Sequence, residues 1–157
     1  MRILQNVETI SLFMTRDHVS GDNELEETLK EVKRRDWERA WNKAKIASAR
    51  IKTHIFLEEE VLFPYLKGPD LDNWISELMM QHVAIWNLLD NILRLVEERD
   101  NETEVKLILL MQLLKAHNSI EEHSIYRELD KELAWNPNIL FELRDSILPA
   151  GWKPKYM

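Results

Sequence analysis

The strongest constraint on the fold of this chain is a short pattern that occurs twice, a histidine followed four residues later by a glutamate. The first copy is His54 with Glu58, and the second is His117 with Glu121, 63 residues further on. On an α-helix this spacing places the imidazole and the carboxylate on one face, one turn apart. Apolar residues flank the first pair, so that face is expected to point into a helical core. A carboxylate buried there requires a hydrogen-bond donor or a metal ion.

Two further histidines repeat the same order. His18 precedes His54 by 36 residues, and His82 precedes His117 by 35. The chain is therefore interpreted as two helix pairs in tandem, each with one lone histidine and one His-x-x-x-Glu. In an antiparallel bundle, all six side chains can lie at a common depth, since they occupy matched heights on their helices. The predicted metal ligands are His18, His54, Glu58, His82, His117 and Glu121.

The chemistry of this set favours a pair of transition-metal ions. Imidazole combined with carboxylate suits Fe, Mn, Zn or Cu, whereas Ca²⁺ and Mg²⁺ prefer ligands that are all oxygen. Two carboxylates can bridge two ions, and two imidazoles then remain for each ion. An octahedral ion in such a site keeps an open position, which predicts reactivity. The alternative is that the histidines are hydrogen-bonded core residues without a metal.

Length and composition place this pattern in one helical domain. The chain has 157 residues, of which 45% are hydrophobic and 31% charged, with only three Gly. Periodicity predicts four long helices. The first runs from about residue 8 to about 32, the second over 37–65, the third from 70 or 72 to about 100, and the fourth over 101–134. A short helix follows at 139–147, then a tail at 149–157. We therefore expect an all-α fold, an up-and-down antiparallel four-helix bundle over about 8–135 with a C-terminal extension over 136–157, in a single domain, 1–157.

Some details of these helices are also predicted. Gly21 lies just after His18 and favours a kink or break there. Asp36 is expected to cap the second helix, and Asn101 with Glu104 resembles a capping box at the start of the fourth. The inner face of the fourth helix is predicted to carry, before His117, the side chains of Val105, Leu109 and Leu113.

Several function classes are excluded by what the sequence lacks. The net charge is −7 with no block of Lys or Arg, which argues against nucleic-acid binding. Without any Cys there are no disulfides, zinc-thiolate sites or iron–sulfur ligands. No signal-peptide run or membrane-length apolar stretch occurs, so a soluble cytoplasmic protein is expected. Glu-x-x-His, the ligand motif of ferritin-like bundles, is absent, as are nucleotide-binding glycine motifs.

Other polar residues near the motifs have two interpretations each. Asp22 lies four residues after His18 and is either an additional ligand or proton relay, or simply an acid at a helix irregularity. His123 lies off the inner face and is interpreted as a surface residue or a residue that supports a ligand. Glu59, Glu60 and Glu122 follow the ligand glutamates and turn away from them by about 100° per residue. They are expected to be solvated or, less simply, to attract incoming cations.

These residues resemble the hemerythrin-like HHE cation-binding family. The resemblance rests on His18, His82, the segment His54-Ile-Phe-Leu-Glu58-Glu-Glu-Val-Leu-Phe-Pro and the segment His117-Asn-Ser-Ile-Glu121-Glu, and it extends over about residues 8–135. It implies a four-helix bundle with two non-haem iron ions, bridged by the two glutamates. His18 and His54 would serve one iron, and His82 and His117 the other. The same ligands also accept Mn or Zn.

The sequence departs from the oxygen-carrying members of that family. Those carriers have another histidine four residues along the third helix and His-x-x-x-x-Asp on the fourth. Here the residues four positions from His82 are Leu78 and Trp86, and the fourth helix has His-x-x-x-Glu. The missing fifth imidazole argues against reversible oxygen carriage. It shifts the resemblance toward members tied to iron-centre repair, nitric oxide or peroxide responses, and iron or oxygen sensing.

Three functional hypotheses follow. The favoured one is a cytoplasmic di-iron protein that binds O₂ or a related small molecule, nitric oxide or peroxide, as a sensor or store. The alternative is a role in which the site donates iron to repair damaged iron–sulfur or di-iron centres, or reduces peroxide as an enzyme. The third is a metal-free helical interaction module. No protein partner and no oligomeric state are predicted.

Overall fold

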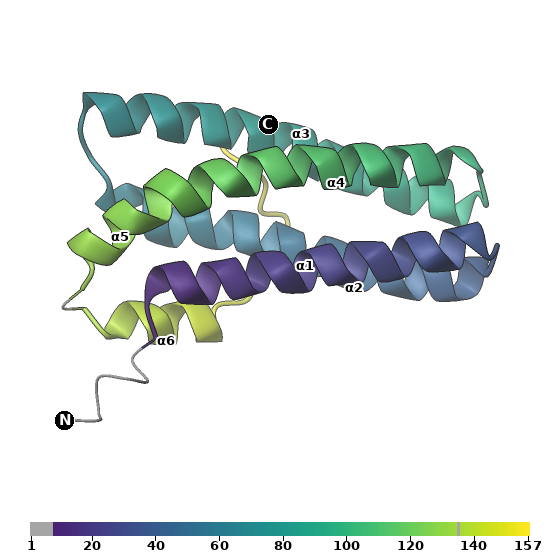
Figure 1. Cartoon of the computed structure of the whole chain (residues 1–157), viewed down its shortest axis with the longest axis horizontal. Coiled ribbons are helices and arrows are strands. Elements are labelled where there is room, and N and C mark those ends of the chain that lie inside the picture. Colours follow the sequence, from purple (N-terminus) through teal and green to yellow (C-terminus); the bar gives the residue numbers. More distant parts are fainter. Residues whose placement is uncertain (1–7, 135) are drawn as a thin grey trace.

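The chain folds into four long helices that lie side by side (Figure 1). The structure is a computed structural model that describes residues 8–134 and 136–157. The long helices are α1 (Ile10–Lys33), α2 (Trp37–Phe56), α3 (Pro69–Glu97) and α4 (Glu102–Ile120). α2 continues into the π-helical η2 (Leu57–Leu62) and the 3₁₀ turn η3 (Phe63–Tyr65), and α4 into the π-helical η4 (Glu121–Ile125) and α5 (Tyr126–Glu132). α6 (Asn138–Asp145) follows, and no strand occurs in the described residues. The predicted all-α bundle is confirmed.

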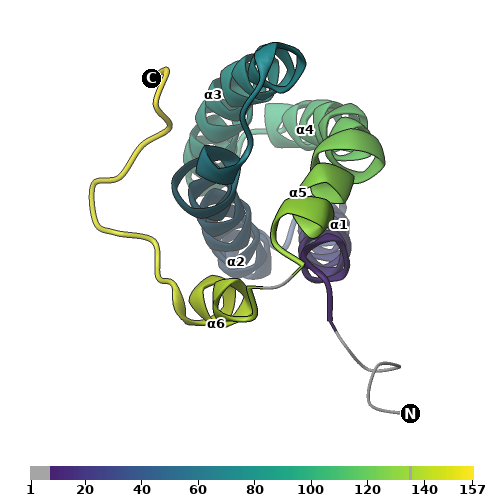
Figure 2. The same ribbon diagram turned by 90° about the vertical axis from the view of Figure 1, so that its left-hand side faces the viewer.

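The four helices close into a ring. α1 packs on α2 and α4, and α3 packs on the same two neighbours, so the end-on view shows four helices around one centre (Figure 2). The C-terminal tail lies outside this ring. There the indole of Trp152 meets Phe56 and Trp86 edge-on, with ring centroids 5.2 and 5.7 Å apart. Its Nε1 donates to Oε1 of Glu60 at 2.9 Å, and these contacts attach the tail to α2, η2 and α3.

Within each helix pair, the same kind of turn joins the two helices. α1 ends with Arg35 in the left-handed conformation (φ 60°), and α3 ends with Arg99 there (φ 56°). In each turn the next residue, an aspartate, donates its backbone N–H to a carbonyl five residues earlier: Asp36 to Glu31 at 3.0 Å and Asp100 to Leu95 at 2.9 Å. This Schellman motif satisfies the free carbonyls at a helix end. The tandem repeat inferred from the histidines therefore extends to the turns.

The predicted caps are right at one helix and wrong at the other. Oδ1 of Asp36 accepts a hydrogen bond from the backbone N–H of Arg39 at 3.2 Å, as expected for the start of α2. Asn101 makes no capping hydrogen bond with its side chain. Instead Oδ1 of Asp100 accepts from the backbone N–H of Glu102 at 2.8 Å. Asp100, one residue before Asn101, therefore provides the capping hydrogen bond expected from Asn101.

The predicted break near Gly21 does not occur, since α1 runs without interruption from Ile10 to Lys33. Gly21 is buried against α2, and a Cβ placed on it would lie 3.5 Å from Cγ1 of Ile51. Glycine therefore lies in a regular helix at a close helix–helix contact, and tertiary packing outweighs its weak helix propensity.

The inner face of α4 also differs from the prediction. Val105 is 63% exposed and Leu109 48% exposed, whereas the buried leucines are Leu107, Leu110 and Leu114. Stepping back from His117 in fours accumulates about 40° of rotation per step, because a helix has 3.6 residues per turn. Alternating steps of three and four keep the buried face in phase, and the structure follows that spacing.

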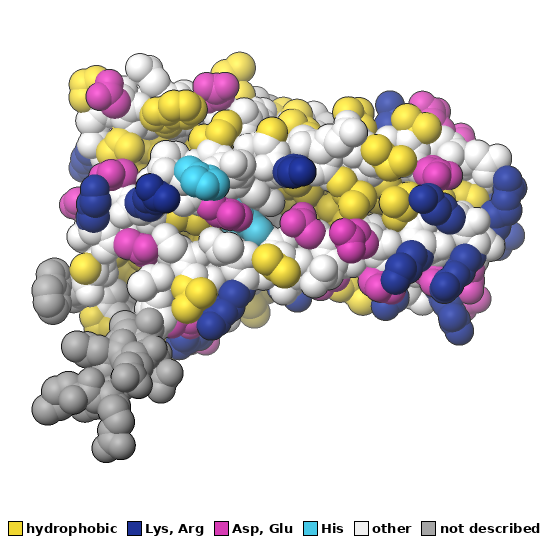
Figure 3. All heavy atoms as spheres, viewed as in Figure 1, with side chains coloured by type: hydrophobic (Ala, Val, Ile, Leu, Met, Phe, Trp, Pro, Cys, Tyr) yellow, Lys and Arg dark blue, Asp and Glu magenta, His cyan; other side chains and the backbone are white. Residues whose placement is uncertain are grey.

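The predicted ligands occupy a polar layer between two apolar clusters. On α1, for example, Met14 belongs to one cluster, Leu25 to the other, and His18 lies between them. The same order holds along α3, where Leu78 and Ile85 lie on either side of His82. The outer surface over α1 and α4 mixes acidic, basic and apolar side chains and shows little histidine (Figure 3). The bundle thus fixes the depth at which the site forms.

Replacing Gly21 by alanine should stabilise the protein, by about 0.5–1 kcal/mol, because alanine costs less backbone entropy in a helix and the added Cβ meets Ile51 at an ordinary van der Waals distance. Urea denaturation of wild type and Gly21→Ala measures this. Gly68→Ala is the matched control, since Gly68 has φ +131° and should lose stability on the same substitution. Loss of stability in Gly21→Ala would contradict the expectation.

Candidate metal centre

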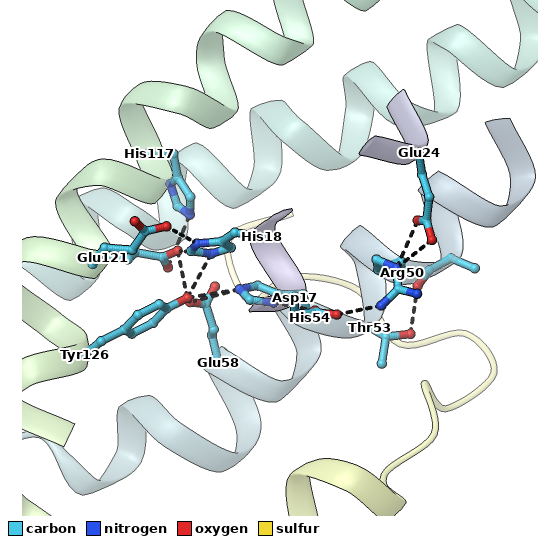
Figure 4. Close-up of polar contacts among 12 residues, drawn as sticks. Asp17, His18, Glu24, Arg50, Thr53, His54, Glu58, His117, Glu121 and Tyr126 are labelled. Carbon is cyan, nitrogen blue, oxygen red and sulfur yellow. Dashed lines mark hydrogen bonds and ion pairs between the residues drawn. The ribbon is translucent and has the colours of Figure 1, made fainter. Parts of the chain in front are cut away.

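Six side chains from all four long helices converge in the polar layer. His18 comes from α1, His54 from α2, His82 from α3 and His117 from α4, and each is at most 7% exposed. Glu58 and Glu121 are fully buried between them, in the two π-helical segments. Figure 4 shows Glu58 and Glu121 facing the imidazoles of His18, His54 and His117. The structure therefore brings all six predicted ligands together.

These residues form two sets that share both glutamates. His18, His54, Glu58 and Glu121 each offer a ligand atom within 4.8 Å of the others. His82 and His117 do the same with the same two carboxylates. This arrangement fits two cations, each held by two imidazoles, with the glutamates between them, and it matches the pairing of histidines that the resemblance implies.

Every ligand histidine is oriented by an oxygen on its outer nitrogen. Nδ1 of His18 lies 2.7 Å from Oε2 of Glu122, Nδ1 of His54 lies 2.7 Å from Oδ2 of Asp17, and Nδ1 of His82 lies 2.7 Å from Oε2 of Glu59. Nδ1 of His117 lies 2.6 Å from the amide oxygen of Gln81. Carboxylate and amide oxygens only accept, so each Nδ1 carries the hydrogen and donates it. The free lone pair of each neutral imidazole is then on Nε2, as in many metal sites.

The four Nε2 atoms point at carboxylate oxygens. Nε2 of His18 lies 3.2 Å from Glu121, that of His54 3.5 Å from Glu58, that of His82 3.1 Å from Glu58, and that of His117 3.3 Å from Glu121. Oε2 of Glu121 is buried and has no hydrogen-bond partner among the described residues. Acceptors facing acceptors in a buried layer repel one another unless protons or metal cations lie between them. The donor set and the unpaired oxygen both fit a metal ion.

The pKa values of these groups show how the layer is held together without metal. Burial lowers the pKa of His82, but hydrogen bonds to Glu58 and Glu59 outweigh it and raise the pKa to about 9. Burial also lowers the pKa of His54. Glu58 and Asp17 outweigh this effect and raise the His54 pKa well above its ordinary value. For Glu58, burial would raise the pKa, but His54 and further hydrogen bonds hold it well below the usual range. Protons on His54 and His82 therefore compensate the carboxylates when no metal is bound.

Sequence reasoning missed Tyr126, whose hydroxyl lies in the middle of one ligand set. It is 2.9 Å from Nε2 of His18, 3.0 Å from Nε2 of His54, 2.8 Å from Oε2 of Glu58 and 3.2 Å from Oε1 of Glu121. Figure 4 shows these contacts converging on the phenol oxygen. Burial first, and then the charges of Glu121 and Glu58, raise the pKa of Tyr126 well above its usual value. A bound cation would reverse that electrostatic effect.

The π-helical turns explain why Tyr126 faces inward. It lies five residues after Glu121, a spacing that turns a side chain away on an α-helix but brings it back on a π-helix, whose bonds run from i to i+5. Phe63 lies five residues after Glu58 in the first copy, and its ring is parallel to that of His82, with centroids 6.0 Å apart. When the two copies of the repeat are aligned, Tyr126 corresponds to Phe63. This correspondence is the sequence signal that could have identified Tyr126 as a residue of the site.

Glu59 and Glu122 are not simply solvated, contrary to the expectation. Glu59 is 8% exposed and also accepts a hydrogen bond on Oε1 from the backbone N–H of Lys155 at 2.9 Å. Glu122 is half-buried beside His18. Both lie in the first turn of a π-helical segment, and both orient a histidine from the other helix pair. Glu60 remains exposed, as predicted.

Asp17 is part of a longer chain of charged groups (Figure 4). Its Oδ1 accepts from Arg50 at 2.8 Å, and Nε of Arg50 donates to both oxygens of Glu24 at 2.8 and 2.9 Å. Burial alone would raise the pKa of Asp17, but His54 and Arg50 outweigh it and hold the pKa below its ordinary value. Asp17 therefore presents a full negative charge to His54.

The remaining candidates lie outside both ligand sets. Asp22 is exposed on α1 and belongs to neither set. His123 is exposed, and its Nδ1 donates to the carbonyl of Ser119 at 2.8 Å, which agrees with a surface residue. A small cavity adjoins the site, with about 20 Å³ of free space for a water-sized sphere. Apolar residues on one side of the cavity (Gly21, Ile51, Ile55, Ile85 and Leu114) meet polar ones on the other: Asp17, His18, Asp22, Arg50, His54, Glu58, His117 and Asn118.

The free energy of unfolding of the metal-free protein should fall as the pH rises from about 6.5 to about 9. His82 has a raised pKa of about 9 in the folded protein, against an ordinary 6.5. Its proton therefore stabilises the fold fully below pH 6.5, and this contribution is lost as the pH rises through 9. The raised pKa of His54 acts in the same direction. Urea denaturation in the presence of a chelator, across this pH range, measures the effect.

Two substitutions test where this pH dependence arises. His82→Gln should reduce it, because one titrating imidazole is removed while His54 remains. His123→Gln should leave it unchanged, since His123 is exposed and lies outside the layer. Stability that rises over the same pH range would contradict the assignment.

Comparison with known proteins agrees with this site. A family profile described as the hemerythrin HHE cation binding domain matches residues 13–129, a stretch that contains all six predicted ligands. No curated protein and no solved structure was found to match the chain. None of the described helices is long and apolar enough to cross a membrane. Because the profile covers well over half of the sequence, the chain belongs to the hemerythrin HHE cation-binding domain family.

Proposed function

We propose that the protein holds two iron ions in its polar layer and uses them to bind O₂ or a related small molecule, nitric oxide or peroxide, as a sensor or store. His18 and His54 would hold one ion, His82 and His117 the other, and Glu58 with Glu121 would bridge them. When bound, the iron pair supplies open coordination positions and the redox chemistry that such ligands require.

One observation carries this proposal: the buried oxygens and nitrogens of the site face each other without enough hydrogens. Oε2 of Glu121 is fully buried and has no hydrogen-bond partner in residues 8–134 and 136–157. The outer partners of all four histidines fix the hydrogen on Nδ1, and this leaves every Nε2 directed inward. A site of this kind is organised to receive cations rather than to donate hydrogen bonds to a substrate.

The cavity beside the site supports a small ligand. Its free space of about 20 Å³ is close to what one water molecule needs, about 10–15 Å³ or more. So small a space, bordered by Gly21, Ile51 and Leu114, favours a molecule of a few atoms over an extended one. Ile85 and Leu114, which border the cavity, are buried, and they exclude bulk water from the histidines.

Iron analysis of the purified protein tests the metal, and we expect two equivalents. Absorption spectra of the iron-loaded protein should show an oxo-bridged di-iron signature that responds to O₂ or nitric oxide. Bound iron should raise the free energy of unfolding, by about 2.7 kcal/mol at a free concentration 100 times Kd, because the metal binds only the native state.

Glu58→Gln should lose most of the bound iron and the associated stabilisation, since the carboxylate lies in both ligand sets. Glu77→Gln, an exposed glutamate on α3, is the matched control and should retain both ions. Metal-free protein whose stability does not change on adding iron would favour the interaction-module hypothesis. Iron-loaded protein that responds to neither gas nor peroxide would remove the proposed ligand while leaving the metal site.

A further inference from the structure

The two halves of the site are related by the tandem repeat, but the repeat is broken at two contacts. In both halves the residue before the lone histidine orients the histidine of the His-x-x-x-Glu pair. That residue is Asp17 beside His54 in the first half and Gln81 beside His117 in the second, at 2.7 and 2.6 Å. A full negative charge in one half thus corresponds to a neutral amide in the other.

The second break lies five residues after each ligand glutamate. Tyr126 places its hydroxyl among His18, His54 and both glutamates. Its counterpart Phe63 lies flat beside His82 and offers no oxygen. Both breaks therefore favour the half around His18 and His54. The first gives this half an additional negative charge, and the second gives it an additional oxygen atom.

From these contacts we propose that the two ion positions are unequal and fill in order, with the His18–His54 position tighter than the His82–His117 position. The inference rests on the proposed function, because it presumes that the site binds two ions. A carboxylate that accepts the Nδ1 hydrogen raises the basicity of a ligand histidine. His54, paired with Asp17, is therefore a stronger electron-pair donor to a metal ion than His117, which is paired with the neutral amide of Gln81. The Tyr126 oxygen adds a donor at the tighter position.

The other charges near the site do not reverse this order. Arg50 beside Asp17 is also paired with both oxygens of Glu24, so the three groups together keep one negative charge. Glu122 and Glu59 occupy equivalent places on the two lone histidines. Glu59 is more buried than Glu122, so solvent screens its charge less. The two glutamates still carry the same charge, whereas Asp17 and Gln81 differ by a whole charge.

Titration of the metal-free protein with Co²⁺, followed by calorimetry and visible absorption, tests the order without any activity assay. Wild type should bind two ions in two steps, the first at least about tenfold tighter. His18→Ala should abolish the first step and keep the second, and His82→Ala should do the reverse. Circular dichroism establishes that each variant is folded.

Three nearly isosteric substitutions then test the causes. Asp17→Asn should weaken the first step by about 10–100-fold and leave the second unchanged, as is usual when an outer partner of a ligand is lost. Gln81→Glu should tighten the second step by about tenfold and bring the two closer together. Tyr126→Phe, which copies Phe63, should weaken the first step.

The outcomes separate this inference from the proposed function. Two ions bound with equal affinity, or a first step lost in His82→Ala, would overturn the order while leaving the di-metal site intact. A first step that tightens in Tyr126→Phe would also overturn it, because the phenol would then compete with the ion rather than bind it. Wild-type protein that binds no Co²⁺ and no iron would refute both.

Discussion

The structure depends on one electrostatic constraint, two buried glutamates placed between four imidazole nitrogens in a polar layer. Neither group can be solvated there, so the layer is stable only when positive charge, as protons or as metal ions, lies between the two kinds of acceptor. The apolar clusters on both sides keep water out and strengthen that requirement. The same side chains that would destabilise an ordinary helical core therefore define the place where a cation binds.

Most of the fold and the convergence of the six candidate ligands could be predicted from the sequence, because both follow from helical periodicity. The histidines lie where an apolar stripe would otherwise continue, and their spacing relates the four helices without any knowledge of their packing. Predictions failed where the local rule was incomplete. Gly21 has poor helix propensity, but it is buried where α1 packs on α2, and this packing keeps it helical. Val105 and Leu109 were predicted inside, although a four-residue step drifts away from the face of His117.

The residues that support the ligands were beyond such rules for a different reason. Asp17 and Gln81 adjoin lone histidines in sequence, but only the pairing of α1 with α2 and of α3 with α4 shows which imidazole each one reaches. Glu59 and Glu122 act across the repeat, each on a histidine of the other helix pair. The two halves consequently hold each other in place, and the site is a property of the closed ring rather than of either hairpin.

The π-helical turns have a consequence for how this chain tolerates insertions and deletions. Each turn accommodates one residue more than an α-helix would between the ligand glutamate and the aromatic ring that follows it. Deleting one residue within Glu122–Ile125 would leave the aromatic ring four residues after the glutamate, a spacing that an ordinary α-helical turn keeps on the same face, whereas inserting one more residue would turn the ring away. The length of the segment between glutamate and aromatic ring is thus as much a part of the metal centre as the ligands themselves.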